Sequence, residues 1–365
     1  MLSAERRRRL AAAMAEAGID EMLLYGNAWQ GDYLRYAADF GILEGHGIAL
    51  VAADGSIELF LDSAVEAERA EAEAPGVKIV LARDIARAVG ARLDRIANHR
   101  IAAAPRRFVP KWLADPERSF SLEDGTALVD TLLMHKLPAE IDAIRRAARI
   151  ADDAYGVFRA AVKVGRPQYE LVADVEAYLR SRGCPDNFMI LGSGGKDVLG
   201  MTPPSDRRIA AGDLVTTELT PCVEGYYVQI CRTVVVGPAS EAQRRACALY
   251  REALEAGIAA VKPGAIAADV ARAENDVFRK YGLGDYVTSK WTRVRGHGLG
   301  LFCDSKPHIL EDVDTPLVPG MALIVHPNTY HPEVGYLVLG DSVVVTDNGC
   351  EVLCETPREL FEVER

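Results

Sequence analysis

The sequence has no long hydrophobic run, no export-type leader and little concentrated positive charge. No stretch reaches the roughly 18 apolar residues that a membrane-spanning helix needs, and no charged segment followed by an apolar one opens the chain. The longest basic run is the RRRR at 6–9, and the formal net charge is -11. Such a chain is poorly suited to neutralising phosphates. We therefore expect a cytoplasmic protein with no nucleic-acid and no membrane partner.

The cysteines also lack a pattern. There are seven of them, an odd number, and none forms a CxxC pair. This distribution fits reduced thiols better than a disulfide framework or a zinc knuckle.

Length and patterning predict two domains. At 365 residues the chain is long for one hydrophobic core. Helical and strand-like segments alternate at first, as in SAERRRRLAAAMAEAG, EMLLYG, GIALVAA and IELFLD, which predicts an α/β layer with a partly parallel sheet. We expect a boundary within 120–130, giving domains 1–125 and 126–365. The second domain combines long amphipathic helices, at 137–162, 168–183 and 241–261, with antiparallel strand pairs, so the predicted class is α+β.

A predicted hairpin in the second domain carries polar side chains on one face. Two β-rich runs flank PCVEG at 221–225 in GDLVTTELTPCVEGYYVQICRT, which indicates a loop of about five residues. This loop would set Glu218 opposite Gln229. By period-2 alternation, Thr220, Tyr227 and Cys231 would share their face. A hairpin face of this kind can simply meet water, or it can line a cavity.

Six fragments in order resemble a known superfamily. They are MHKLPAEIDAIRRAARIADDAY, SDRRIAAGDLV, GYYVQICRTVVVG, GHGLGL, VPGMALIVHP and GDSVVVT. Over about residues 130–350 this order is similar to the pita-bread fold of creatinase, prolidase, aminopeptidase P and methionine aminopeptidase. The first domain resembles the smaller α/β domain of the creatinase and prolidase branch. The resemblance implies a homodimer whose pockets are completed across the dimer.

The resemblance also implies positions for metal ligands. The metallopeptidases of this superfamily hold two metal ions with two Asp, one His and two Glu. Those positions fall here on Glu218, Gln229, His297, His326 and Gly340. One of the five is kept by identity, and a two-metal site needs several anionic oxygens. We therefore expect no dinuclear centre, no metal and no cofactor.

Creatinase, which hydrolyses a C–N bond without metal, has segments that resemble short stretches of this chain such as LEDVDTPLVPGM. Its base position falls on Met201, and its hairpin Tyr and Glu fall on Tyr227 and Cys231. A later Arg falls on His308, and an Arg that reaches the partner subunit's substrate falls near Glu44. Without these arginines, the pocket is expected to suit a neutral or cationic ligand better than an amino-acid carboxylate.

Three hypotheses follow from these positions. The first is a metal-independent hydrolase of a C–N bond in a small polar non-peptide compound. The second is a mononuclear metal enzyme using Glu218, His297 and His326. The third is a non-catalytic binding module. The candidate catalytic residues are Glu218, His297, His326 and Tyr227. The candidate substrate-binding residues are Gln229, Cys231, Asp304, His308, Met201 and Glu44. Structural roles stay open for several of them, for example a hydrogen-bonded core histidine at His326 or an inert buried thiol at Cys231.

Overall fold

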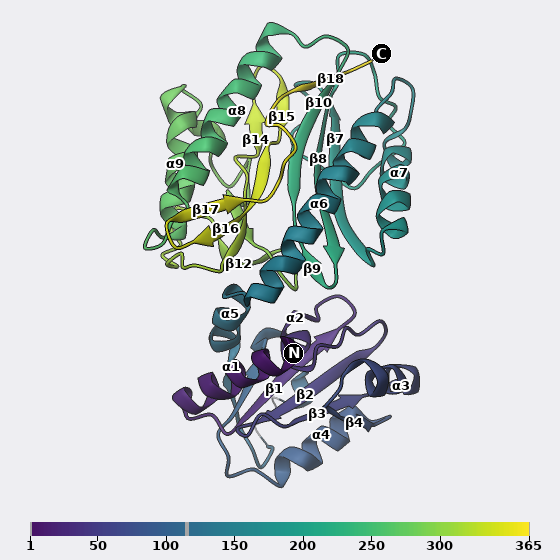
Figure 1. The fold of residues 1–365 in the computed structure, drawn as a ribbon, viewed down its shortest axis with the longest axis vertical. Coiled ribbons are helices and arrows are strands. Elements are labelled where there is room, and N and C mark those ends of the chain that lie inside the picture. Colours follow the sequence, from purple (N-terminus) through teal and green to yellow (C-terminus); the bar gives the residue numbers. More distant parts are fainter. Residues whose placement is uncertain (1, 114–116, 365) are drawn as a thin grey trace. The chain divides into compact units, whose positions relative to one another are not determined.

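The computed structural model describes residues 2–113 and 117–364. The chain divides into two compact units, Met1–Leu133 and Met134–Arg365. Each unit combines a sheet with helices (Figure 1), which confirms the predicted α+β class.

The first unit is built on a mixed sheet in the order β4-β3-β2-β1-β5-β6. The central strands β1, β2 and β3 pair antiparallel, whereas β4, β5 and β6 join in parallel. This arrangement confirms the partly parallel sheet expected from the alternating segments. The elements are α1 (Leu2–Ala17), β1 (Glu21–Asn27), α2 (Asp32–Ala38), β2 (His46–Ala52), β3 (Ile57–Leu61), α3 (Ala64–Glu73), β4 (Lys78–Leu81), α4 (Ile85–Asp94), β5 (Ile101–Ala104), β6 (Leu122–Asp124) and α5 (Thr126–Met134).

The second unit contains, within its described residues, a ten-stranded sheet whose main path is β12-β11-β13-β16-β10-β8-β7. β17, β18 and β9 pair off this path, and β14 and β15 form a separate pair. The strands are β7 (Asp186–Gly194), β8 (Leu214–Val223), β9 (Tyr226–Tyr227), β10 (Ile230–Val236), β11 (Gly296–Gly298), β12 (Ser305–His308), β13 (Ala322–Val325), β14 (Thr329–His331), β15 (Gly335–Leu337), β16 (Gly340–Thr346), β17 (Gly349–Val352) and β18 (Phe361–Val363).

Four long helices flank these strands, with α6 and α7 on one side and α8 and α9 on the other (Figure 1). They are α6 (Pro138–Ala161), α7 (Gln168–Ser181), α8 (Glu241–Ala260) and α9 (Ala267–Lys280). The start of α6 follows from its sequence, because Pro138 suits the first turn and the Glu140 carboxylate accepts a hydrogen bond from the Leu137 N–H at 2.7 Å. The first three were predicted, whereas α9 was not.

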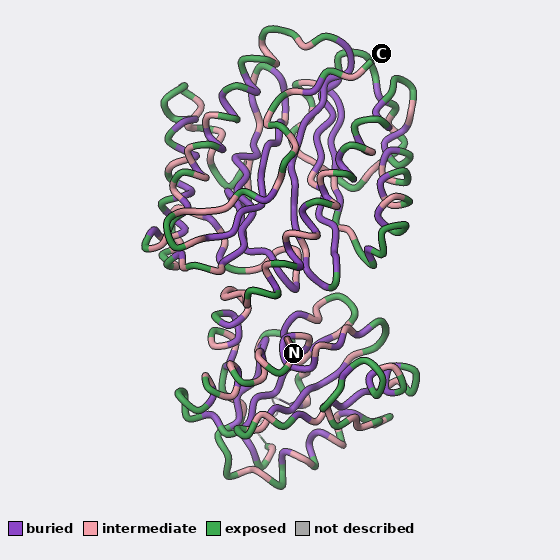
Figure 2. Tube along the Cα trace, viewed as in Figure 1, coloured by how far each residue is buried: buried purple, intermediate pink, exposed green. Residues whose placement is uncertain are grey.

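The core of the second unit lies where α8 and α9 cover the sheet. Tyr250 and Phe278 meet edge to face at 5.0 Å between ring centroids, and both are fully buried. In Figure 2 the strands of this unit are largely buried, whereas each helix shows an exposed outer side. Among the described residues no helix has the length and apolar character for crossing a membrane.

A buried ion pair joins the middle of this sheet to the C-terminal segment. The guanidinium of Arg232 on β10 donates to Asp341 on β16 at 2.6 Å, and both side chains are almost fully buried. Arg358 binds the other carboxylate oxygen of Asp341. Arg232 also donates to four carbonyl groups, among them those of Gly340 and Thr356. Two cations therefore depend on one buried carboxylate.

This arrangement predicts a large stability effect. Asp341→Asn keeps the shape of the side chain but leaves Arg232 and Arg358 without their counter-charge. We expect the free energy of unfolding, measured by urea titration, to fall by about 3–5 kcal/mol. The control is Glu362→Gln, which removes the exposed partner of Arg244 and should change it by less than about 1 kcal/mol. Equal effects of the two variants would contradict this description of the core.

Candidate functional site

The hairpin forms with a tighter turn than predicted. Glu224 and Gly225 make a two-residue loop, and both have positive φ, at 53° and 86°, the backbone that two-residue hairpins require. Glu218 therefore lies opposite Cys231, not Gln229. The predicted register was wrong by two residues, and since side chains alternate with a period of two, the predicted shared face is unchanged.

Glu218 lines a cavity of about 260 Å³ within the second unit. The walls come from β7, β8, β11, β15 and three loops, so segments far apart in the sequence meet here. β8 and β11 are separated in the sheet by β10, β16 and β13. The lining residues are Ile190, Leu199, Gly200, Met201, Glu218, Trp291, Thr292, Arg293, Val294, His297, His326, Asn328 and Tyr336.

The Glu218 carboxyl is enclosed by protein although it is partly accessible from the cavity. Its Oε1 accepts a hydrogen bond from the Asn328 side-chain amide at 2.8 Å. Desolvation raises the pKa of Glu218 to about 7, against the opposing effects of the Asn328 hydrogen bond and the charge of Arg293. A carboxyl with this pKa can exchange a proton near neutral pH.

Asn328 is held in one orientation by the backbone around it. Its Oδ1 accepts the Leu339 N–H at 3.0 Å, so its Nδ2 must be the atom that donates to Glu218. Its own carbonyl accepts a hydrogen bond from Arg295 at 3.2 Å. Sequence reasoning missed Asn328, since Glu218 lies 110 residues away in the chain.

Two neutral histidines face the same cavity. Their rings lie 5.7 Å apart between centroids in an edge-on arrangement. Burial lowers the pKa of His297, and burial together with the neighbouring His297 lowers the pKa of His326 to about 3. The Nδ1 of His297 lies 3.0 Å from the Gly298 carbonyl, which accepts the proton and leaves a lone pair on Nε2. The Nδ1 of His326 is buried without a hydrogen-bond partner.

Of the ten predicted site residues, the cavity brings together four: Glu218, His297, His326 and Met201. The other residues of the hairpin are engaged elsewhere. The Tyr227 hydroxyl donates to Asp186 at 2.6 Å, and the Gln229 amide lies 3.4 Å from the Cys231 sulfur. Cys231 is fully buried, and this burial raises the pKa of its thiol. None of these three lines the cavity.

Asp304 and His308 lie beside the cavity lining. Asp304 accepts a hydrogen bond from Arg293 at 2.6 Å and lies 3.2 Å from the His308 Nε2. Burial opposes ionisation of Asp304, but His308, His297 and Arg293 outweigh it and lower its pKa to about 2. Glu44 belongs to the first unit, where Ser63 donates to its carboxylate at 3.1 Å.

Sequence reasoning also missed Arg293 and Trp291, which line the cavity from the segment before β11. Arg293 brings a guanidinium to a site where no positive charge was expected. Its sequence neighbourhood, KWTRVRGHG, contains several basic residues, and nothing in that pattern indicates which of them reaches the cavity.

The space around His326 restricts the neighbouring strand. A Cβ added to Gly340 would lie 2.6 Å from the His326 Cβ, 2.9 Å from the Val325 carbonyl oxygen and 3.2 Å from the Cys231 sulfur. Gly340 therefore cannot take a larger side chain unless its neighbours move. Within 2–113 and 117–364, no three His, Cys, Asp or Glu side chains are grouped so that they could hold a metal ion.

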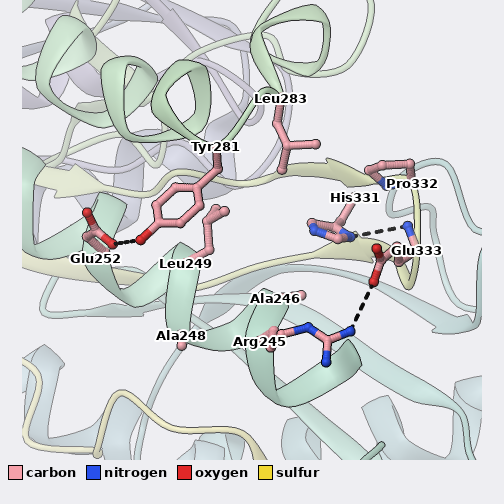
Figure 3. A pocket seen from close by; sticks show the side chains of 10 residues that line it. All are labelled: Arg245, Ala246, Ala248, Leu249, Glu252, Tyr281, Leu283, His331, Pro332 and Glu333. Atoms are coloured by element: carbon pink, nitrogen blue, oxygen red, sulfur yellow. Dashed lines mark hydrogen bonds and ion pairs between the residues drawn. The ribbon is translucent and has the colours of Figure 1, made fainter. Parts of the chain in front are cut away.

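A larger hollow, of about 430 Å³, lies over α8 and the ends of α9 and β14 (Figure 3). Its polar groups bind one another: Tyr281 donates to Glu252 at 2.7 Å, and Arg245 pairs with Glu333 at 3.6 Å. It contains none of the predicted site residues. We therefore place the candidate site at the smaller cavity.

Comparisons with known proteins agree on a family. The profile described as Metallopeptidase family M24 matches residues 142–347, and the Creatinase/Prolidase N-terminal domain matches 6–133. A Xaa-Pro dipeptidase of Pyrococcus furiosus is 33% identical over 64% of this chain and 67% of its own length. The Xaa-Pro dipeptidase structure from Bacillus anthracis has a TM-score of 0.86 at 26% identity, covering 99% of this chain and 100% of that one. For dipeptidase PepE from Mycobacterium ulcerans the TM-score is 0.85 at 28% identity, with 100% and 98% covered.

These comparisons confirm the predicted pita-bread fold with its creatinase-type N-terminal domain. They also correct two expectations. A hydrolase of a non-peptide C–N compound is contradicted, because the relatives carry dipeptidase names, and the binding-module and mononuclear-metal alternatives are not favoured either. Metal independence is contradicted, because the matching family is one of metallopeptidases. The resemblance to creatinase rests on short segments, whereas the likeness to the dipeptidase structures extends over 99% and 100% of this chain.

The raised pKa of Glu218 predicts a pH dependence of stability. A carboxyl with a pKa of about 7 when folded, against 4.5 ordinarily, stabilises the protein fully below pH 4.5, and this contribution is lost as pH rises through 7. Glu218→Gln removes the titration. Between pH 5 and 8, wild type should therefore lose about 2–3 kcal/mol relative to this variant in urea unfolding. Parallel stability curves for the two proteins would show that Glu218 titrates normally.

Proposed function

Because the chain belongs to the M24 metallopeptidase family, we propose that it hydrolyses the peptide bond of dipeptide-sized substrates, with Glu218 as the general base. The observation that carries this proposal is the Glu218 carboxyl on the cavity wall, held by Asn328 and with a pKa of about 7. The relatives named Xaa-Pro dipeptidase make Xaa-Pro dipeptides the first substrates to test. A cavity of about 260 Å³ suits a small molecule better than a polypeptide segment.

In this proposal Glu218 removes a proton from the attacking water. A general base works best when its pKa is close to the working pH, and desolvation supplies that match here. Asn328 fixes the carboxyl through Oε1, so that Oε2 is the oxygen assigned to the water. The proton can then pass to the leaving amine.

The two imidazoles are assigned to hydrogen bonding. His297 presents a lone pair on Nε2, because its Nδ1–H is held by the Gly298 carbonyl, and it can accept a hydrogen bond from a substrate N–H. His326 stays neutral at every pH at which the protein is expected to work. A neutral imidazole N–H can donate to the scissile carbonyl oxygen.

Arg293 is assigned to the substrate carboxylate. It lines the cavity, and one of its nitrogens donates to Asp304, which leaves the remaining donors of the guanidinium for a second anion. This replaces the expectation of a neutral or cationic ligand, which rested on the arginines absent at His308 and Glu44. Met201 is proposed to contact substrate as part of the cavity lining. The other predicted residues of this unit are proposed to support the site from outside the lining: Tyr227, Gln229, Cys231, Asp304 and His308.

The two-metal centre of the family has a poor counterpart in this chain. Of the five positions that the resemblance assigns to ligands, Gln229 is a neutral amide in contact with Cys231, and Gly340 has no space for a carboxylate beside His326. Glu218, His297 and His326 contribute one carboxylate and two imidazoles, too little negative charge for two divalent cations. The residues thus do not fit the dinuclear group, and no step above is derived through it.

The activity assay is the test of this function. Purified protein is incubated with a panel of Xaa-Pro and other dipeptides, in parallel with added Mn²⁺ or Co²⁺ and with a chelator, and released amino acids are quantified. We expect hydrolysis by wild type and a loss of at least about 100-fold in kcat for Glu218→Gln. The control is Glu252→Gln in the larger hollow over α8, and this variant is expected to retain full activity. If no dipeptide is cleaved under any of these conditions, the proposal is wrong.

We also propose a cytoplasmic homodimer, in which the domain predicted over 1–125 and residues near Glu44 serve the partner's cavity. What supports this proposal is the resemblance to the creatinase and prolidase branch, whose N-terminal domain matches residues 6–133. Multi-angle light scattering at micromolar concentration should give about twice the chain mass of 39.6 kDa. A monomer mass would refute the dimer.

A further inference from the structure

The cavity has an apolar side that the catalytic proposal does not use. Leu199 and Met201 follow β7, and Trp291 precedes β11. Leu199 is 59% exposed although it lines the cavity. A large apolar side chain left open at the edge of a polar cavity is a surface that a ligand can cover.

Trp291 is held in place by other aromatic rings. Its ring stacks on Tyr330 at 4.8 Å with an interplanar angle of 18°, and Tyr286 lies 5.5 Å away. The Thr329 hydroxyl donates to the Tyr286 carbonyl. Because Thr329 begins β14, this hydrogen bond joins the aromatic cluster to that strand. The indole is thus fixed before any ligand arrives.

The same cluster also binds the loop that carries Leu199 and Met201. The Tyr330 hydroxyl donates to the Lys196 carbonyl at 2.9 Å, and the Tyr336 N–H donates to the Val198 carbonyl at 2.9 Å. Gly335 lets the two segments come close: its φ is 98°, and a Cβ there would lie 2.0 Å from the Gly195 carbonyl oxygen. Tyr330 therefore contacts Trp291 directly, and it binds the loop that carries Leu199 at Lys196. The indole and the backbone of this loop are thus held before a ligand binds, and such preorganisation lowers the entropy cost of binding.

Positive charges flank the indole. The Lys290 ammonium lies 4.5 Å from the Trp291 ring centroid, and Arg293 follows two residues later in the lining. A cationic substrate side chain near the indole would be repelled by both of these positive charges. An uncharged ring or branched aliphatic chain would instead gain contact with Trp291 and Leu199.

We propose that Trp291 and Leu199 form the specificity site of this protein and select dipeptides with a large uncharged apolar side chain, aromatic above all, over those with small or cationic side chains. This inference rests on the proposed dipeptide substrate. It adds a preference for the substrate side chain. The catalytic groups assigned above do not produce this preference, because they are assigned to the peptide bond and to the substrate carboxylate.

The first test compares Phe-Pro, Gly-Pro and Lys-Pro as substrates. Wild type should favour Phe-Pro, mainly through a lower KM. Trp291→Ala should lower kcat/KM for Phe-Pro by about 10–100-fold, the range typical of a lost apolar pocket contact, and leave Gly-Pro within a few-fold. Trp291→Phe should retain most of the wild-type kcat/KM for Phe-Pro. The matched control is Tyr281→Ala, an exposed aromatic residue outside the cavity.

A binding measurement separates this inference from the proposed hydrolysis. The protein has three tryptophans, so the variant W29F/W112F/E218Q reports on Trp291 fluorescence alone and cannot turn substrate over by the proposed route. Phe-Pro should bind at least about tenfold more tightly than Gly-Pro and Lys-Pro. If wild type cleaves nothing but this preference is observed, the catalytic proposal fails and the specificity site stands.

The result that overturns the inference is equal affinity for the three dipeptides, or an affinity for Phe-Pro that Trp291→Ala leaves unchanged. Because loss of the indole could unfold the aromatic cluster, Leu199→Ser is tested beside it. Leu199 is exposed, so this variant should fold and still weaken Phe-Pro binding at least threefold. Unchanged Phe-Pro binding by Leu199→Ser would equally refute the proposed specificity site.

Discussion

The Asn328 amide donates a hydrogen bond to the Glu218 carboxyl at 2.8 Å, and the chemistry of the cavity depends on this contact. An enclosed carboxyl costs free energy when it is ionised, and the nearby imidazoles are neutral because burial disfavours their charged forms too. The amide offsets part of that cost, and as a result Glu218 titrates near neutrality instead of staying protonated. A carboxyl in this state can accept a proton from water.

The site is assembled from strands that are not neighbours in the sheet. Glu218 on β8 and His297 on β11 are separated by three strands, yet they line one cavity. The Arg232–Asp341 pair ties β10 to β16 near the middle of this path. The fold therefore fixes the distance between Glu218 and His297 through its least exposed residues, which suits a site that needs rigid geometry.

Sequence reasoning succeeded where the signal was local or repeated. The polar face of the hairpin survived an error in its register, because a shift of two residues leaves every side chain on the same face. The helices α6, α7 and α8 were found from their periodicity, and the fold was identified from six fragments in order. The helix α9 was not predicted. Its Asp269 accepts the Ile266 N–H at 3.0 Å, but the N-cap residue is the apolar Ile266, which lacks the side-chain oxygen of a usual N-cap.

The remainder of the site depends on contacts between distant segments. Nothing near Asn328 in the sequence indicates that its amide meets Glu218, 110 residues earlier. Trp291 and Leu199, likewise far apart in the sequence, line one cavity, and Tyr330 binds the segments on both sides of it, at Trp291 and at the Lys196 carbonyl. The predicted function was wrong for a different reason: it rested on departures at single ligand positions, whereas the likeness to a dipeptidase structure extends over 99% of the chain.

The most direct measurement is a crystal structure of the Glu218→Gln variant with bound Phe-Pro. Our account predicts that the scissile carbonyl lies beside the amide that replaces the Glu218 carboxyl, with the dipeptide carboxylate on Arg293 and the phenyl ring against Trp291. Electron density for the dipeptide in the hollow over α8, or nowhere in the crystal at saturating concentration, would contradict it.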